Sequence, residues 1–155
     1  MAINPNTDFS SGAVLTAAQQ NRFPRGVMGA VYRTAGDYTM STTVGDVTGM
    51  SITFTAVASR TYKASWTISG YKATSNGWAA IYLTNSANTV FGSVYNTALI
   101  SGVGYFNLSG FTYFSNLTAG SQTLKLRAQI ENAAGVINAS GTNPAVFMVE
   151  DCGPS

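Results

Sequence analysis

The chain has 155 residues, which suits one domain with a buried core. Eight basic and six acidic residues make up only 9% of it, against about 25% in a typical soluble domain. The basic residues are scattered and the net charge is only +2, which excludes the concentrated positive surface of a nucleic-acid-binding protein. A surface so poor in charge suits a chain that is covered in an assembly or works outside a cell.

Residues 1–25 are expected to form an arm with one short helix. Thr16 and Gln19 have the spacing of a capping box, which predicts about two helical turns within residues 14–21. Pro24 ends the helix because it pushes the preceding residue out of helical geometry. An arm of this kind often serves for docking or oligomer contacts, and a simple lid over the following domain is the alternative. The candidate docking residues are Leu15, Phe23, Pro24 and Arg25.

From residue 26 onward the pattern indicates strands and turns only. Residues 27–33 and 37–44 are the first two expected strands, and the dipeptides at 45–46 and 48–49 have turn chemistry. Even-numbered residues are apolar and odd-numbered residues polar from 50 to 56, and again from 61 to 68. This alternation predicts two strands with one buried face each, connected by residues 57–60.

The second half of the chain continues in the same way. Residues 78–84 are apolar on both faces, and residues 89–95 are expected to pair back on them as a hairpin. Aromatic residues crowd the stretch 102–114, where the apolar parity switches near Gly110 and predicts a bulge or bend. Residues 123–131 alternate most regularly, with 124, 126, 128 and 130 expected inside. A short piece at 136–137 and an apolar strand at 145–149 follow.

These elements predict an all-β fold, an antiparallel, jelly-roll-like β-sandwich of about eight to ten strands over residues 26–155. The strands at 78–83 and 145–149 are apolar on both faces. A second apolar face needs a cover, and a neighbouring subunit would supply it. We therefore predict self-association, as a homotrimer.

The sequence contains no recognisable set of catalytic residues. It has no histidine, which removes the usual general base and the commonest metal ligand. Asp37 with Asp46, or Glu150 with Asp151, could meet a partner carboxylate as in a glycosidase, but turn positions and a solvated C-terminus explain them more simply. Ca²⁺ could use Asp37 or Asp46, although no D-x-D-x-D-G loop supports it. We expect no enzyme, no catalytic residue, no metal ligand and no cofactor.

The sequence also predicts no membrane insertion and no signal peptide. It has no apolar stretch of 18 residues, and neither a basic start nor an apolar run follows Met1. The lone Cys152 excludes an intramolecular disulfide and is expected to be a buried or incidental thiol. If the protein acts outside a cell, it would leave by lysis or by packaging into a particle.

The 18 aromatic residues are the richest material for binding. Small β domains often bind glycans by stacking sugars on Tyr and Trp and by hydrogen bonds from Asn and Ser. Tyr71, Lys72 and Asn76 precede Trp78 in a turn-rich section, and these four are the candidate ligand-binding residues. The alternative is that most aromatic residues belong to the core or to a subunit interface.

Three runs carry a resemblance to a known group of proteins. They are VLTAAQQN (14–21) leading to FPRG (23–26), DVTGMSITFTAVASR (46–60) and VEDCGP (149–154). Together they resemble small minor tail or tail-fibre proteins of tailed bacteriophages of actinobacterial hosts. The spacing of Phe54, Tyr62 and Trp66 is also similar to that of trimeric jelly rolls of the C1q and tumour-necrosis-factor type, although Arg60 and Thr61 stand where those proteins have a glycine.

The resemblance implies a virion protein, made in the host cytoplasm, that forms a homotrimer. Its N-terminal arm would dock on other virion proteins, and its β domain would face outward to bind a host-surface glycan. The alternative is a capsid decoration or head-fibre protein that binds only other virion proteins.

Overall fold

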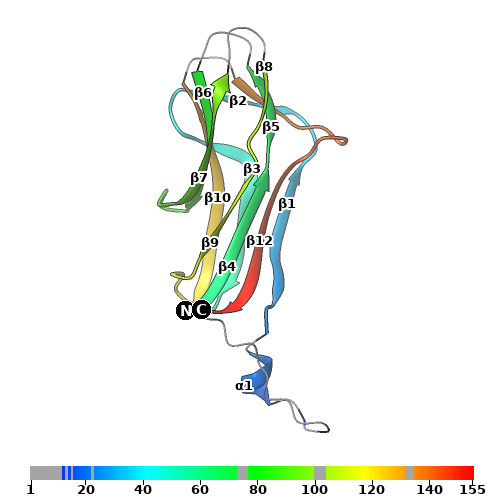
Figure 1. The fold of residues 1–155 in the computed structure, drawn as a ribbon, viewed down its shortest axis with the longest axis vertical. Coiled ribbons are helices and arrows are strands. Elements are labelled where there is room, and N and C mark those ends of the chain that lie inside the picture. Colours follow the sequence, from blue (N-terminus) through cyan, green and yellow to red (C-terminus); the bar gives the residue numbers. More distant parts are fainter. Residues whose placement is uncertain are drawn as a thin grey trace.

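The structure, a computed structural model, describes residues 12, 14, 16–21, 23–72, 77–99, 104–131 and 135–155. These residues form one helix, α1 (Ala17–Gln20), and twelve strands in three antiparallel sheets (Figure 1). The predicted all-β, jelly-roll-like sandwich is confirmed. The described strands outnumber the predicted eight to ten because four of them are pieces of four residues each.

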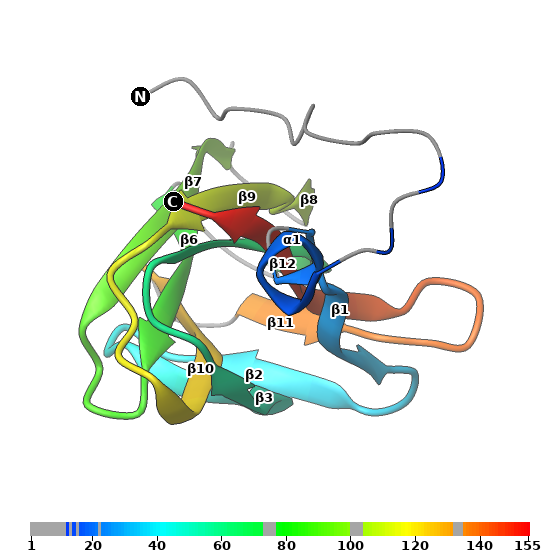
Figure 2. The same cartoon turned by 90° about the horizontal axis from the view of Figure 1, so that it is seen from below.

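Two sheets face each other as the layers of the sandwich (Figure 2). The first sheet has the order β1-β12-β4-β9, made of β1 (Gly26–Arg33), β12 (Ala145–Pro154), β4 (Arg60–Thr67) and β9 (Gly110–Phe114). The second has the order β3-β10-β6-β7, made of β3 (Gly45–Ala56), β10 (Gly120–Ile130), β6 (Gly77–Asn85) and β7 (Val90–Leu99). The β6–β7 hairpin predicted from the sequence is confirmed, with Leu83 opposite Gly92.

The third sheet extends the first sheet strand by strand. Its order is β2-β11-β5-β8, made of β2 (Asp37–Met40), β11 (Gly135–Asn138), β5 (Ser69–Lys72) and β8 (Gly104–Asn107). The two orders correspond place by place: β2 follows β1 along the chain, β11 precedes β12, β5 follows β4, and β8 precedes β9. The bend predicted near Gly110 is one of the breaks between the two sheets, and there the Leu108 amide donates to the Ile68 carbonyl at 2.7 Å.

The core fills the space between the layers by the predicted alternation. Leu124, Leu126, Ala128 and Ile130 of β10 are all at most 1% exposed. From the first sheet, Tyr62 is fully buried between the rings of Phe54 and Phe114, with ring centroids 5.4 and 6.1 Å away. The residues that the sequence places inside therefore form one continuous core.

The two regular strands at 50–56 and 61–68 belong to different sheets. Strand β3 pairs with β10, whereas β4 pairs with β12 and β9, so residues 57–59 carry the chain from one layer to the other. The turns expected at the dipeptides 45–46 and 48–49 are absent, and both dipeptides lie within β3. Gly49 has a φ of 80°, and the register with β10 shifts in this region, so the glycine makes a bulge instead.

The predicted capping box of α1 is confirmed. The Gln19 amide donates to Thr16 Oγ1 at 3.2 Å, and the Thr16 amide donates to Gln19 Oε1 at 2.9 Å. The helix has four residues instead of about two turns, because Asn21 already caps its C-terminal end.

Helix α1 and the C-terminus lie at one end of the long molecule, and β5 and β8 lie at the other (Figure 1). We call these ends the base and the apex. This polarity positions the candidate sites described below.

Candidate functional site

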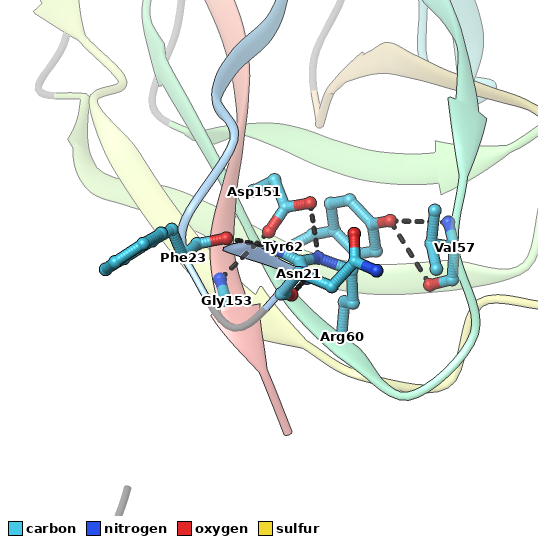
Figure 3. Close-up of polar contacts among 7 residues, drawn as sticks. All are labelled: Asn21, Phe23, Val57, Arg60, Tyr62, Asp151 and Gly153. Atoms are coloured by element: carbon cyan, nitrogen blue, oxygen red, sulfur yellow. Dashed lines mark hydrogen bonds and ion pairs between the residues drawn. The ribbon is translucent and has the colours of Figure 1, made fainter. Parts of the chain in front are cut away.

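A buried arginine fixes the arm to the base (Figure 3). Arg60, the first residue of β4, is only 4% exposed and its Nε lies 2.6 Å from Oδ2 of Asp151, which is 1% exposed. Its Nη1 and Nη2 donate to the carbonyls of Asn21 and Phe23, each at 2.6 Å. The other carboxylate oxygen of Asp151 accepts from the Gly153 amide at 2.9 Å. The guanidinium therefore joins the arm to β12 through charge-assisted hydrogen bonds.

Tyr62 supports this anchor from the interior. Its hydroxyl accepts from the Val57 amide at 2.7 Å and lies 3.3 Å from the Val57 carbonyl, to which it can donate. These bonds hold the connection between β3 and β4 next to Arg60 (Figure 3).

The candidate docking residues lie where the arm meets the base. Phe23 is 40% exposed, and Pro24 and Arg25 are exposed beside it. Leu15 lies outside the described residues. Because Arg60 donates hydrogen bonds to the carbonyls of Asn21 and Phe23, the last part of the predicted arm is joined to the sandwich. The side chains of 23–25 are exposed to solvent at this junction.

The outer face of the first sheet carries several exposed apolar side chains beside the Lys63–Glu150 ion pair. Tyr32, Phe111 and Tyr113 are 62%, 63% and 56% exposed. Cross-strand register sets Met148 opposite Ser65, and Ser65 opposite Phe111, so these side chains form continuous rows. We call this surface the apolar face; it is formed by Val27, Tyr32, Phe111, Tyr113, Val146 and Met148. Exposed apolar side chains gathered on one face make it a candidate interaction surface.

A hollow of about 550 Å³ opens on the apolar face beside the protruding aromatic rings. Its lining is mixed: the apolar side chains are Trp66, Val94, Phe111, Val146 and Met148, and the polar or charged ones are Lys63, Ser65, Thr67, Ser93 and Ser109. The indole Nε1 of Trp66 is buried and has no hydrogen-bond partner among the described residues. A buried donor left unpaired costs about 1–3 kcal/mol.

The apex carries a different, polar cavity of about 600 Å³. We call it the apex cavity; its lining residues are Ser69, Gly70, Tyr105, Phe106, Asn107, Asn138 and Asn143. None of these residues is charged. Amide and hydroxyl groups around an aromatic ring are the usual lining of a site for a neutral polar ligand.

The predicted ligand-binding residues are not all brought together. Tyr71 and Lys72 end strand β5 in the third sheet, and backbone register sets Tyr71 opposite Tyr105. Trp78 lies in β6 of the second sheet, and Asn76 lies outside the described residues. The sequence reasoning missed Tyr105, Asn107 and Asn138. The alternation of exposed 105 and 107 with buried 106 and 108 was the available signal.

The acidic residues considered for catalysis have partners in the fold. Asp46 lies 2.6 Å from Lys125 Nζ and 2.8 Å from Arg127 Nε, and the hydrogen bond from Lys125 is the main cause that holds the Asp46 pKa below its ordinary value. Asp37 accepts from the Asn138 amide at 2.7 Å, and Glu150 lies 3.6 Å from Lys63. Among the described residues, no three His, Cys, Asp or Glu side chains gather as a metal site would require.

Cys152 is partly buried. Burial is the main cause that raises the pKa of its thiol, and the charge of Glu150 adds to it. This environment disfavours the reactive thiolate. In the part of the chain that the structure describes, no helix has the length and apolarity to cross a membrane.

No protein-family model and no curated protein sequence matches the chain. Among solved structures, the Eiger tumour-necrosis-factor protein of S. frugiperda is 10% identical over 84% of this chain and 96% of its own, with a TM-score of 0.48. The VP2 protein of the infectious bursal disease virus subviral particle is 13% identical over 98% of this chain and 42% of its own, with a TM-score of 0.41. A protein of the disulfide-linked pili of Bacillus endospores is 13% identical over 84% of this chain, with a TM-score of 0.28. Similarities at this level say nothing about function.

Proposed function

We propose that the chain is a non-enzymatic structural subunit of a bacteriophage virion. It forms a homotrimer, docks on the particle through its N-terminal arm and presents its apex to a glycan on the host surface. The resemblance of the sequence to minor tail and tail-fibre proteins suggests the virion. The structural observation that supports the proposal is the polarity of the molecule: the arm is anchored at the base, and the apex cavity lies at the opposite end.

The apolar face supports the homotrimer. It combines protruding rings, Phe111 and Tyr113, with the hollow beside Val146 and Met148. A surface with both a protrusion and a hollow can bind the next copy head to tail. Such contacts form a closed ring when the rotation from one copy to the next divides a full turn evenly. Three copies arranged in this way would leave the three arms at one end and the three apices at the other.

The exposed residues at the end of the arm support docking. Phe23, Pro24 and Arg25 emerge from the base next to the Arg60 anchor, so their backbone direction is set before any partner binds. A pre-ordered segment loses less conformational entropy on binding than a free one.

The second candidate is a decoration or head-fibre protein that binds only other virion proteins. The anchored arm and the apolar face favour it as much as they favour a tail protein, since neither feature needs a host ligand. The two candidates differ in their place on the particle and in what the apex does.

Two measurements on the full chain test the proposal. Gold-labelled antibody on intact virions is expected at the tail tip or baseplate, and purified protein is expected to bind the bacterium that the phage infects. Label over the capsid with no cell binding would select the decoration protein instead. Absence of the label from purified virions would refute both candidates.

A variant separates docking from folding. Phe23→Ala with Arg25→Ala shortens two side chains at the end of the arm and should weaken binding to particles that lack the protein about tenfold or more; an unchanged melting temperature would show that the loss is not one of folding. Thr55→Ala, at an exposed position of β3 on the second sheet, is the matched control and should bind as wild type does.

A further inference from the structure

Polar side chains cross the third sheet in a single row. Backbone register sets Asp37 opposite Asn138 and Ser69 opposite Asn107, and Ile137 opposite Gly70 brings Asn138 next to Ser69. The row therefore runs over all four strands, β2, β11, β5 and β8. Three of its members, Asn138, Ser69 and Asn107, line the apex cavity.

Hydrogen bonds within the row orient the amides before a ligand binds. The Asn138 amide donates to Asp37 Oδ1 at 2.7 Å, and the Asn107 amide donates to Ser69 Oγ at 3.2 Å. The Ser109 hydroxyl donates to Asn107 Oδ1. Each bond from a side-chain amide uses one of its two N–H groups, so the orientation of Asn107 and Asn138 is fixed by neighbours within the protein.

An aromatic ring stands at the edge of the row. Tyr105 is 84% exposed, the most exposed aromatic side chain described, whereas its neighbour Phe106 is 4% exposed and packs into the core. A ring exposed to this extent is open to stacking by a ligand. The apolar face of a pyranose ring stacks on an aromatic ring, and the sugar hydroxyls then reach amide and hydroxyl groups at its side.

The charge of the cavity limits the ligand. None of the described lining residues carries a charge, and the nearest charge in the row is the carboxylate of Asp37, which already accepts from Asn138. A phosphorylated, sulfated or carboxylated sugar would find no cation among the described lining residues and would face this negative group. Among those residues a neutral sugar meets amides, a hydroxyl and the tyrosine ring.

From this arrangement we infer that the apex cavity binds a neutral hexose or N-acetylhexosamine unit of a glycan. Tyr105 stacks on the sugar ring, and Asn107, Asn138 and Asn143 bond its hydroxyl groups. The inference rests on the proposed function, since it names the site and the sugar class for the proposed contact with the host surface.

The test uses the full chain on an array of immobilised oligosaccharides, neutral ones alongside sialylated, sulfated and phosphorylated ones. The neutral oligosaccharide with the strongest signal is then titrated in solution by calorimetry. We expect binding to neutral oligosaccharides only. Tyr105→Ala and Asn138→Ala should each weaken it about tenfold or more, and Tyr105→Phe, which keeps the ring, should retain most of it.

The matched control is Thr55→Ala on the second sheet, which should bind as wild type does. Tyr105 is so exposed that its removal should leave the melting temperature unchanged, and equal melting temperatures show that lost binding is not lost folding. The inference is overturned if no neutral oligosaccharide binds, if only charged ones bind, or if Tyr105→Ala and Asn138→Ala bind as wild type does.

Binding of the same variants to whole host cells separates this inference from the proposed function. If cells bind wild type and both variants equally, the host contact stands and the apex cavity is not its site. If oligosaccharides bind through Tyr105 but cells do not bind, the site stands and the host role fails.

Discussion

Arg60 and Asp46 show how differently a charged residue acts when it is buried and when it is exposed. Arg60 and Asp151 are almost fully enclosed, so each charge depends on the other and on the carbonyls of the arm for compensation. Asp46 is 54% exposed and lies between Lys125 and Arg127 on the surface of the second sheet, where water screens the pair. The first contact holds the arm in place, and the second adds only modestly to stability.

Replacement of Arg60 should therefore destabilise the fold strongly. Arg60→Met leaves Asp151 buried without its cation, and we expect a loss of about 3–5 kcal/mol in the free energy of unfolding, measured by urea denaturation. The lost bonds to Asn21 and Phe23 should also speed tryptic cleavage after Arg25.

The matched control is Lys63→Met, in the same strand and facing an acid of the same partner strand. Lys63 and Glu150 are about one-third exposed, so this change should cost no more than about 1 kcal/mol. Equal losses in the two variants would contradict the role of Arg60 as a buried anchor.

Asp46 should make stability depend on pH. Its pKa is lower in the folded protein than the ordinary 3.8, so its contribution is present above that value and is lost as the pH falls through the lower folded pKa. Asp46→Asn should cost up to about 1 kcal/mol at pH 7, and the difference from wild type should vanish in strong acid. Urea denaturation at neutral pH and near pH 2 measures both values, and a difference that persists or grows in acid would count against the ion pairs.

At the scale of elements, the break between the first and third sheets decides where the sites lie. Each ribbon of this layer bends between its two strands, as at Ile68 between β4 and β5. Below the break the outer face carries the exposed aromatic rings, and above it lies the row of amides and hydroxyls. The two surfaces belong to one layer, yet their chemistry differs, as the proposed contacts with protein and with sugar would require.

Gly70 tests how tightly the third sheet is packed. An added Cβ would lie 2.7 Å from Cε2 of Phe106 and would also meet the Val136 carbonyl oxygen, which belongs to the backbone and cannot turn away. Gly70→Ala should lower stability by about 1–3 kcal/mol and weaken oligosaccharide binding, because Gly70 and Phe106 both line the apex cavity.

Gly141→Ala is the control for this substitution. No atom lies within 4 Å of the added Cβ, so its stability should stay within about 0.5 kcal/mol of wild type. Chemical denaturation of the two variants measures the difference, and a neutral Gly70→Ala would show that β5 and β11 are packed less closely than described.

At the scale of the whole molecule, the apolar face bears on the oligomeric state. We expect light scattering to give three times the 16.2 kDa mass of one chain. Phe111→Ser with Tyr113→Ser removes the protruding rings from the face and should yield monomers that remain folded, because both rings are more than half exposed.

Val90→Ser is the control, since Val90 is also 54% exposed but lies in β7 of the second sheet. This variant should keep the mass of wild type. A monomeric wild type would remove the homotrimer from the proposal, and a trimeric Phe111→Ser/Tyr113→Ser variant would move the interface elsewhere.

The sequence by itself determined which face of each regular strand is buried. Alternation with a period of two decides which side chains of β3, β4 and β10 are buried, because successive residues of a strand point to opposite faces. The capping box of α1 and the bend near Gly110 are equally local, and both were predicted from residues close together in the chain.

The tertiary structure alone decided the partners across long separations. Arg60 meets Asp151 and the arm, and Asn107, Ser69 and Asn138 come into one row, only because strands distant in sequence pair side by side. Local patterns carry no register between such strands, so the sequence pointed to Tyr71 and Trp78 but not to Tyr105. The burial of a side chain could be predicted from the sequence because it follows the alternation within a single strand. The candidate sites could not, because their residues come from several strands that pair across long sequence separations.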